Sequence, residues 1–237
     1  MSDVAARTCR IAICWAVLGA STPAAALADD PPCKPETWNA AIAEFEKEDA
    51  DRPPPQNGVV FVGSSSIRLW DLAVSFPELP AINRGFGGSQ ACDAAHFAEQ
   101  LVVKHRPRLV VFYSGDNDVA AGKTAEQVHH DFREFVGNVR KGLPETPIVI
   151  FSIKPSIARW KLRDVMQAAN KLIAADAEEK DSQLVFIDVW PAMLAENGEP
   201  RKELFREDGL HMNDEGYKVW TELLRPHLEG AEAEGTK

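Results

Sequence analysis

Serine, aspartate and histidine, which together can activate a hydroxyl group as a nucleophile, stand at two points of this chain. Ser64-Ser65-Ser66 follows the apolar run 59–62, with only Gly63 between them. Asp208 and His211 lie three residues apart, just before the last predicted helix. A histidine that is oriented by a carboxylate can remove the proton of a serine hydroxyl. Taken alone, the serine run is more typical of a helix N-cap than of a nucleophile.

Two further segments offer hydrogen-bond donors for a developing negative charge. Residues 83–89 contain three glycines, which allow a backbone N–H to approach a ligand closely. Residues 114–118 contain Asn117, whose side-chain amide can point at an oxyanion. Tight turns are the alternative interpretation of both segments.

Cofactor and metal sites are not favoured by the same segments. Gly85-x-Gly87-Gly88 does not match the G-x-G-x-x-G pattern of a dinucleotide-binding loop. Asp116 and Asp118 lack further ligands at the spacing of a metal-binding loop. We therefore expect no cofactor and no metal.

Apolar strand-like runs alternate with amphipathic segments along most of the chain. Strands are predicted at 59–62, 81–83, 109–113, 148–153 and 184–187, and helices at 36–49, 91–105, 124–141, 159–180 and 213–228. Repeated β–α units imply an α/β fold in which helices cover both faces of a parallel sheet. Ligands of such sheets bind at the carboxyl ends of the strands. Three of the four polar segments follow a predicted strand, as this rule requires.

The first 28 residues have the features of an export signal. Arg7 and Arg10 precede an apolar stretch at 11–20, and Ala26-Leu27-Ala28 resembles a cleavage site. The apolar stretch is too short for an ordinary membrane-spanning helix, although an uncleaved anchor is the alternative. We expect an exported protein, periplasmic or secreted, without stable membrane insertion after cleavage.

The charge and the cysteines add two expectations. The formal net charge of −10 at pH 7 makes nucleic acid an improbable partner. Export into an oxidising compartment favours a disulfide between Cys33 and Cys92, with two free thiols as the alternative. The sequence leaves the oligomeric state open.

Four short segments, taken in order, resemble the landmarks of the SGNH hydrolases, also called GDSL-type esterases. They are Gly63–Ser66, Gly85–Gly88, Gly115–Asp118 and Asp208–His211. The resemblance spans about 59–228 and implies a three-layer α/β/α domain with a flavodoxin-like five-stranded parallel sheet. The expected organisation is a signal peptide at 1–28, a lead-in and helix at 29–57, an SGNH hydrolase domain at 58–230 and a tail at 231–237.

The resemblance also implies roles for individual residues. It makes Ser65 the nucleophile, His211 the base and Asp208 the partner of the base. The oxyanion would be held by the N–H groups of Ser65 and Gly88 and by the amide of Asn117.

Two residue assignments stay open at this point. Ser64 stands where the family often has aspartate, which leaves the choice between Ser64 and Ser65 open, and Ser66 is expected to cap the turn that follows. Trp160, which follows the fourth predicted strand, is a candidate wall of the substrate site, with plain packing as the alternative.

The implied activity is hydrolysis of a small-molecule carboxylic ester through an acyl-enzyme. Within the family, lysophospholipases, thioesterases, arylesterases and carbohydrate deacetylases share the landmark residues, so these residues do not select a substrate. Two other classes stay open. One is an O-acyltransferase, and the other is a non-catalytic carbohydrate- or lipid-binding module on the same fold.

Overall fold

A five-stranded parallel sheet forms the centre of the protein. The computed structural model describes residues 33–180 and 182–233, so the expected signal peptide lies outside the described residues. The strands are β1 (Val59–Gly63), β2 (Ala81–Gly85), β3 (Leu109–Tyr113), β4 (Ile148–Phe151) and β5 (Leu184–Ile187). Their order is β2-β1-β3-β4-β5, and every neighbouring pair is parallel, which confirms the predicted α/β class.

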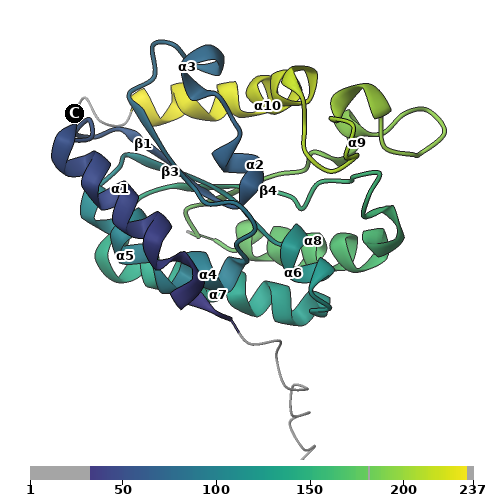
Figure 1. Ribbon diagram of the computed structural model, residues 1–237, viewed down its shortest axis with the longest axis horizontal. Coiled ribbons are helices and arrows are strands. Elements are labelled where there is room, and N and C mark those ends of the chain that lie inside the picture. Colours follow the sequence, from purple (N-terminus) through teal and green to yellow (C-terminus); the bar gives the residue numbers. More distant parts are fainter. Residues whose placement is uncertain (1–32, 181, 234–237) are drawn as a thin grey trace, which may run out of the picture.

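Helices cover both faces of this sheet, so the molecule has three layers (Figure 1). One layer contains α1 (Asn39–Asp51), α4 (Ala91–His96), α5 (Ala98–Leu101), α7 (Ala125–Gly142) and α8 (Arg163–Glu178). The opposite layer contains α2 (Ser65–Arg68), α3 (Leu72–Ser75), α9 (Trp190–Met193) and α10 (Asp214–Ala233). None of the helices in the described ranges combines the length and the apolar character that crossing a bilayer requires.

Strand β1 shows why both layers are needed. Successive side chains of a strand point to opposite faces of the sheet. Val59 and Phe61 belong to the apolar cluster under α10, whereas Val60 and Val62 belong to the cluster under α4 and α7. All four side chains are at most 1 % exposed. A continuous apolar run therefore becomes a central strand that is buried on both faces.

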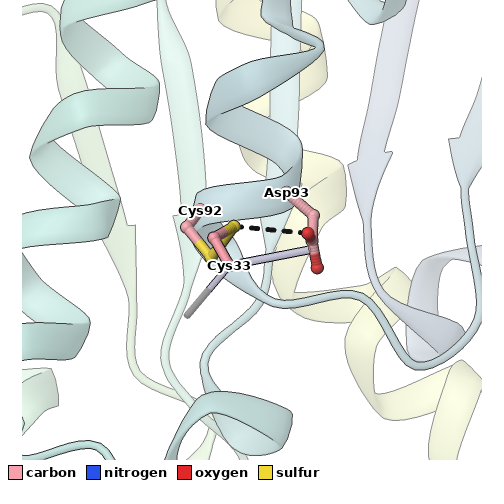
Figure 2. Close-up of side chains that lie close together, drawn as sticks. All are labelled: Cys33, Cys92 and Asp93. Carbon is pink, nitrogen blue, oxygen red and sulfur yellow. Dashed lines mark hydrogen bonds between the residues drawn. A yellow bond between two sulfur atoms is a disulfide. The ribbon is translucent and has the colours of Figure 1, made fainter. Parts of the chain in front are cut away.

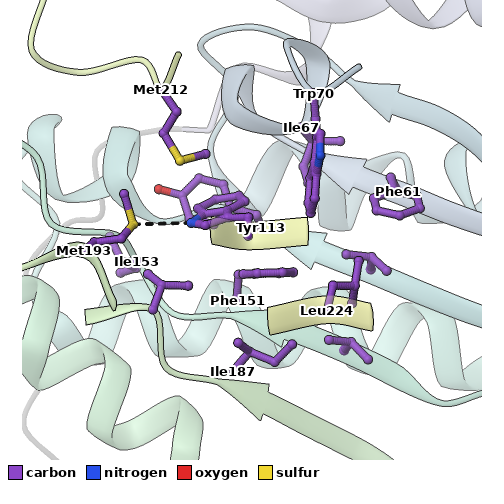
Figure 3. Close-up of a cluster of buried hydrophobic side chains, with 14 of the residues drawn as sticks. Phe61, Ile67, Trp70, Tyr113, Phe151, Ile153, Ile187, Met193, Met212 and Leu224 are labelled. Atoms are coloured by element: carbon purple, nitrogen blue, oxygen red, sulfur yellow. Dashed lines mark hydrogen bonds between the residues drawn. The ribbon is translucent and has the colours of Figure 1, made fainter. Parts of the chain in front are cut away.

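An aromatic cluster holds α10 against the sheet (Figure 3). The rings of Phe151 and Trp220 stack with centroids 4.7 Å apart, and the Trp70 ring lies 5.6 Å from that of Trp220. The indole N–H of Trp220 donates to the sulfur of Met193 at 3.3 Å. This packing places α10 on the sheet, and α10 begins at Asp214, three residues after His211.

The helices predicted at 91–105 and 159–180 differ most clearly from the structure. The helix expected at 91–105 is present as α4, α5 and a 3₁₀ turn at Val103–His105, with the first break at the buried Phe97 (φ −98°, ψ 17°). The helix expected at 159–180 begins at Arg163, after a 3₁₀ turn at Trp160–Leu162. Phe97 is 5 % exposed, so in the first segment tertiary packing overrides the local helical periodicity.

A disulfide between Cys33 and Cys92 joins the first described residue to the first turn of α4 (Figure 2). The two Cα atoms are 6.1 Å apart. Asp93 lies beside the bridge, with its Oδ1 3.3 Å from the sulfur of Cys33. Cys33, Cys92 and Asp93 are close enough to surround an ion, but sulfurs joined to each other supply no thiolate ligand.

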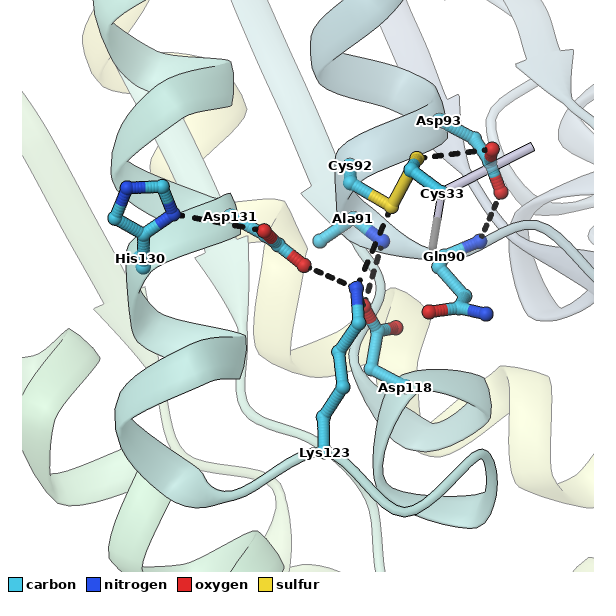
Figure 4. Close-up of a disulfide and its surroundings, with 9 residues drawn as sticks. All are labelled: Cys33, Gln90, Ala91, Cys92, Asp93, Asp118, Lys123, His130 and Asp131. Atoms are coloured by element: carbon cyan, nitrogen blue, oxygen red, sulfur yellow. Dashed lines mark hydrogen bonds and ion pairs between the residues drawn. A yellow bond between two sulfur atoms is a disulfide. The ribbon is translucent and has the colours of Figure 1, made fainter. Parts of the chain in front are cut away.

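Buried charges lie behind this bridge (Figure 4). The ammonium group of Lys123 pairs with Asp131 on α7 and lies 3.7 Å from Asp118 on α6 (Asp116–Ala120). Asp118 in turn accepts the backbone N–H of Ala91 at 3.0 Å. Burial raises the pKa of Asp118 to about 6, although Lys123 and the Ala91 N–H both act to lower it. These contacts join α4, α6 and α7 into one unit.

Removal of the disulfide should destabilise the fold. It closes a loop across a sequence separation of 59 residues, and a bridge of this kind contributes about 2–4 kcal/mol, largely by restricting the unfolded chain. A Cys33→Ser/Cys92→Ser variant should therefore unfold at a lower urea concentration than the oxidised protein. Reductant should shift the wild type toward the variant and leave the variant unchanged. Identical unfolding midpoints for the oxidised wild type and the variant would contradict this role.

Candidate active site

Strand register brings three loops together at one edge of the sheet. Gly63 at the end of β1 is paired with Gly85 of β2 and with Tyr113 of β3. Bonds beyond the strand ends continue the pairing: the N–H of Phe86 donates to Gly63 O at 2.9 Å, and that of Ser64 donates to Tyr113 O at 3.1 Å. The segments after β1, β2 and β3 therefore leave the sheet side by side.

The turn at Gly63 requires glycine. Its φ is +143°, and a Cβ at this position would lie 1.9 Å from the carbonyl oxygen of Tyr113. The absence of a side chain lets β1 and β3 approach closely at the point where the chain turns into α2. This turn presents the serine run at the sheet edge.

Within the serine run, only Ser65 is accessible. Ser64 is the N-cap residue of α2, Ser65 is its first residue, and both Ser64 and Ser66 are 2 % exposed. The expectation that Ser66 caps the turn is wrong, because Ser66 already lies inside the helix. Its carbonyl oxygen accepts the hydroxyl of Tyr217 at 2.9 Å, which ties α2 to α10.

Asn83 anchors the other end of α2, a role that the sequence analysis missed. Its Nδ2 donates to Ile67 O at 2.7 Å and to Trp70 O at 3.2 Å. Its Oδ1 accepts the N–H of Gly85 at 2.9 Å. One amide thus satisfies carbonyls at the end of a four-residue helix and joins that helix to β2. In the sequence, its position as the last residue of the predicted strand 81–83 was the available signal.

His211 lies between Asp208 and Ser65. Its Nδ1 is 2.6 Å from Asp208 Oδ2, and its Nε2 is 3.1 Å from Ser65 Oγ. The loop geometry is set by Asp208, whose Oδ1 accepts the backbone N–H groups of Leu210 and His211, both at 2.9 Å. Partial burial acts to raise the pKa of Asp208, but hydrogen bonds from the His211 ring and from these two N–H groups lower it to about 2.

The two segments expected to supply oxyanion donors contact each other. Gly88 has a φ of +90°, and Asn117 lies in the first turn of α6. The Nδ2 of Asn117 donates to the carbonyl oxygen of Ser89 at 2.9 Å. Because an amide carries two N–H groups, this bond leaves one of them for another acceptor.

The acidic residues beside Asn117 are neutralised by cations of the protein itself. Asp116 forms ion pairs with Lys154, at 2.8 Å, and with Arg159. Burial lowers the pKa of Lys154 to about 7, although the charge of Asp208 acts to raise it. A lysine and an arginine at this carboxylate oppose the binding of a further cation there.

Trp160 packs mainly within the protein. Its ring centroid lies 5.9 Å from that of Trp190, and the guanidinium carbon of Arg163 lies 5.3 Å from its ring. Its role as a wall of the substrate site stays a prediction.

Comparison with known proteins places this arrangement in a family. The model of the GDSL-like lipase/acylhydrolase family matches residues 68–219. The chain belongs to this family. The match confirms the resemblance to SGNH hydrolases. It includes Asp208 and His211 and begins three residues after Ser65.

A curated relative and solved structures agree with this assignment. GDSL esterase/lipase WDL1 of Oryza sativa subsp. japonica is 28 % identical over 171 residues, which cover 63 % of this chain and 65 % of the rice protein. A GDSL-like lipase from Bacteroides thetaiotaomicron is similar in structure with a TM-score of 0.68 and 21 % identity, over 81 % of this chain and 98 % of that one. An acetyl-xylooligosaccharide esterase from Geobacillus stearmophilus gives a TM-score of 0.57 and 16 % identity, over 73 % and 94 %. At these identities, the two structures support the fold alone.

Asn83→Ala should destabilise this GDSL-family domain and its serine-bearing helix. The substitution leaves the carbonyls of Ile67 and Trp70 and the N–H of Gly85 without their partner. A buried donor or acceptor that loses its hydrogen-bond partner lowers the free energy of unfolding by about 1–3 kcal/mol. Urea unfolding should show a loss in this range, whereas Asn197→Ala, on an exposed loop, should unfold like the wild type. An Asn83→Ala midpoint equal to that of the wild type would contradict the anchoring role.

Proposed function

We propose that this protein is an exported serine esterase that hydrolyses carboxylic esters through an acyl-enzyme. The observation that carries the proposal is the continuous line of hydrogen bonds from Asp208 through His211 to Ser65. A carboxylate at one ring nitrogen of histidine and a serine hydroxyl at the other is the arrangement that activates serine.

In the first half of the reaction, His211 Nε2 takes the proton of Ser65 while Oγ forms a bond to the ester carbonyl carbon. The tetrahedral intermediate collapses, and the protonated His211 gives its proton to the departing alcohol. In the second half, His211 removes a proton from water, which attacks the acyl-enzyme carbonyl carbon. When this second intermediate collapses, the bond to Ser65 Oγ breaks, His211 returns its proton to Oγ, and the acid is released. Asp208 keeps the imidazole in one orientation and stabilises its charged form.

The carbonyl oxygen becomes negatively charged in both halves. We propose that it is held by the N–H groups of Ser65 and Gly88 and by the free N–H of the Asn117 amide. The N–H of Ser65 is suited to this role because the first N–H groups of a helix have no partner within the helix. Donors fixed before the reaction stabilise such a charge without reorganisation.

Export is the second part of the proposal. The first 28 residues have the features of a signal peptide. The Cys33–Cys92 disulfide supports the same conclusion, because structural disulfides persist mainly in oxidising compartments.

Ser65→Ala should abolish esterase activity without unfolding the protein. Loss of the nucleophile of such a triad lowers kcat by about 10⁴-fold or more. Hydrolysis of p-nitrophenyl acetate and circular dichroism measure the two quantities. Ser64→Ala is the matched control: its side chain forms no N-cap hydrogen bond, so activity should be kept. Near wild-type hydrolysis by Ser65→Ala would rule out Ser65 as the nucleophile. Loss of hydrolysis in Ser64→Ala alone would rule it out as well.

Activity should fall on acidification because a protonated His211 cannot accept the proton of Ser65. Histidine is the side chain whose charge ordinarily changes between pH 5 and 8. Asp208, with its pKa at about 2, stays ionised over this interval, so a single acid limb is expected in kcat/KM. A pH profile of p-nitrophenyl acetate hydrolysis with background subtraction measures it. A flat profile from pH 5 to 8 would be inconsistent with a histidine base.

A further inference from the structure

A buried charged cluster lies directly behind Asn117, and the proposed reaction does not use it. Asp116 is 5 % exposed and Lys154 is 1 % exposed. Asp116 Oδ2 receives the ammonium group of Lys154 and the hydroxyl of Tyr113, both at 2.8 Å. The guanidinium of Arg159 pairs with the other oxygen, Oδ1. Because the burial of charged groups is costly unless each has partners, a cluster that contains two buried charges needs a function or a structural reason.

Arg159 connects this cluster to the proposed oxyanion site. While one guanidinium nitrogen pairs with Asp116, the other donates to Asn117 Oδ1 at 2.9 Å. A guanidinium only donates hydrogen bonds and keeps its proton throughout the ordinary pH range. Arg159 can therefore bond only to the oxygen of the Asn117 amide. If the amide were flipped, its N–H groups would face the N–H groups of the guanidinium.

The orientation of the amide decides whether Asn117 can act. With Oδ1 held by Arg159, Nδ2 is directed to the carbonyl oxygen of Ser89 and keeps one N–H for an oxyanion. If the amide were flipped, Oδ1 would face the Ser89 carbonyl and the reacting oxygen, and both contacts would be repulsive. The contact with Arg159 thus selects the orientation that can stabilise the negative charge.

We propose that Arg159 is a positioning residue that fixes the amide of Asn117 in its oxyanion-binding orientation. Arg159 is itself held by Asp116, which in turn is bound by Lys154 and Tyr113. This inference rests on the proposed role of Asn117 as an oxyanion donor. It adds a residue that the four family segments do not contain. In this proposal, Arg159 acts through Asn117 and not directly on the substrate.

Arginine suits this task better than lysine. Its planar fork can contact a carboxylate and an amide oxygen at the same time, whereas an ammonium group is a single point of charge on a flexible stem. Lysine at this position would keep a charge for Asp116 and lose the fixed contact with Asn117. Arg159→Lys is therefore a variant that preserves the ion pair and isolates the positioning role.

The test is a double-mutant cycle between Arg159 and Asn117. It compares kcat and KM for p-nitrophenyl acetate in the wild type, Arg159→Met, Asn117→Ala and the combined variant, with circular dichroism to confirm folding. Loss of an oxyanion donor lowers kcat by about 10²–10³-fold, so we expect this for Asn117→Ala and a smaller loss, about 10–100-fold, for Arg159→Met. KM should change by less than about twofold because positioning acts on the transition state. The combined variant should resemble Asn117→Ala, because Arg159 has nothing left to position.

Two further variants complete the design. Lys161→Met removes one positive charge from the exposed surface of the same segment and should keep the wild-type kcat. Arg159→Lys should lower kcat although it keeps the charge, and it covers the case in which Arg159→Met does not fold.

The outcomes separate this inference from the proposed function. A raised KM with unchanged kcat in the Arg159 variants, or losses that multiply in the combined variant, would overturn the positioning role. If Asn117→Ala has a reduced kcat and the Arg159 variants keep the wild-type kcat, the positioning role of Arg159 is overturned. The role of Asn117 as an oxyanion donor would then stand. Full activity in Asn117→Ala would overturn the assigned oxyanion donor as well.

Discussion

The parallel register of β2, β1 and β3 is the constraint on which the site depends. Because Gly63 is paired in register with Gly85 and Tyr113, three neighbouring strands end at the same edge of the sheet. One loop carries Ser65, the next carries Gly88, and the third carries Asn117. A shift of one residue in either pairing would turn every side chain of that strand to the opposite face. The aromatic packing around Trp220 then brings the His211 loop to the same edge of the sheet.

Beneath this edge, buried polar side chains fix the orientation of backbone and amide groups near the site. Asn83 holds the end of the serine helix, and Arg159 holds the amide of Asn117. Asp118, the neighbour of Asn117, accepts the first N–H of α4 and faces Lys123. Buried ions contribute little net stability when compared with apolar packing. Their role here is to fix orientations, because a charged group that only donates or only accepts hydrogen bonds selects one orientation of its partner.

Much of this arrangement is predictable from the sequence because local patterns carry it. Continuous apolar runs predicted the strands, and the positions just after strands indicated Ser65 and Asn117. Asp208 and His211 are close in sequence, so their contact is local. The contacts of Asn83 with Trp70, of Arg159 with Asn117 and of Tyr217 with Ser66 were not predictable, because each joins residues at least 13 apart whose proximity exists only after folding. The break at Phe97 was missed for a related reason: burial against the sheet decides it, and helical periodicity does not show it.

The most direct measurement for the central claim is the position of a covalent adduct. A fluorophosphonate reacts with a serine that a neighbouring base has activated, and tandem mass spectrometry of the labelled peptide distinguishes Ser64, Ser65 and Ser66. The hydrogen-bonded line from Asp208 to Ser65 predicts one adduct on Ser65 in the folded wild type and none in His211→Ala. An adduct on Ser64 or Ser66, or labelling of Ser65 that persists without His211, would contradict the account.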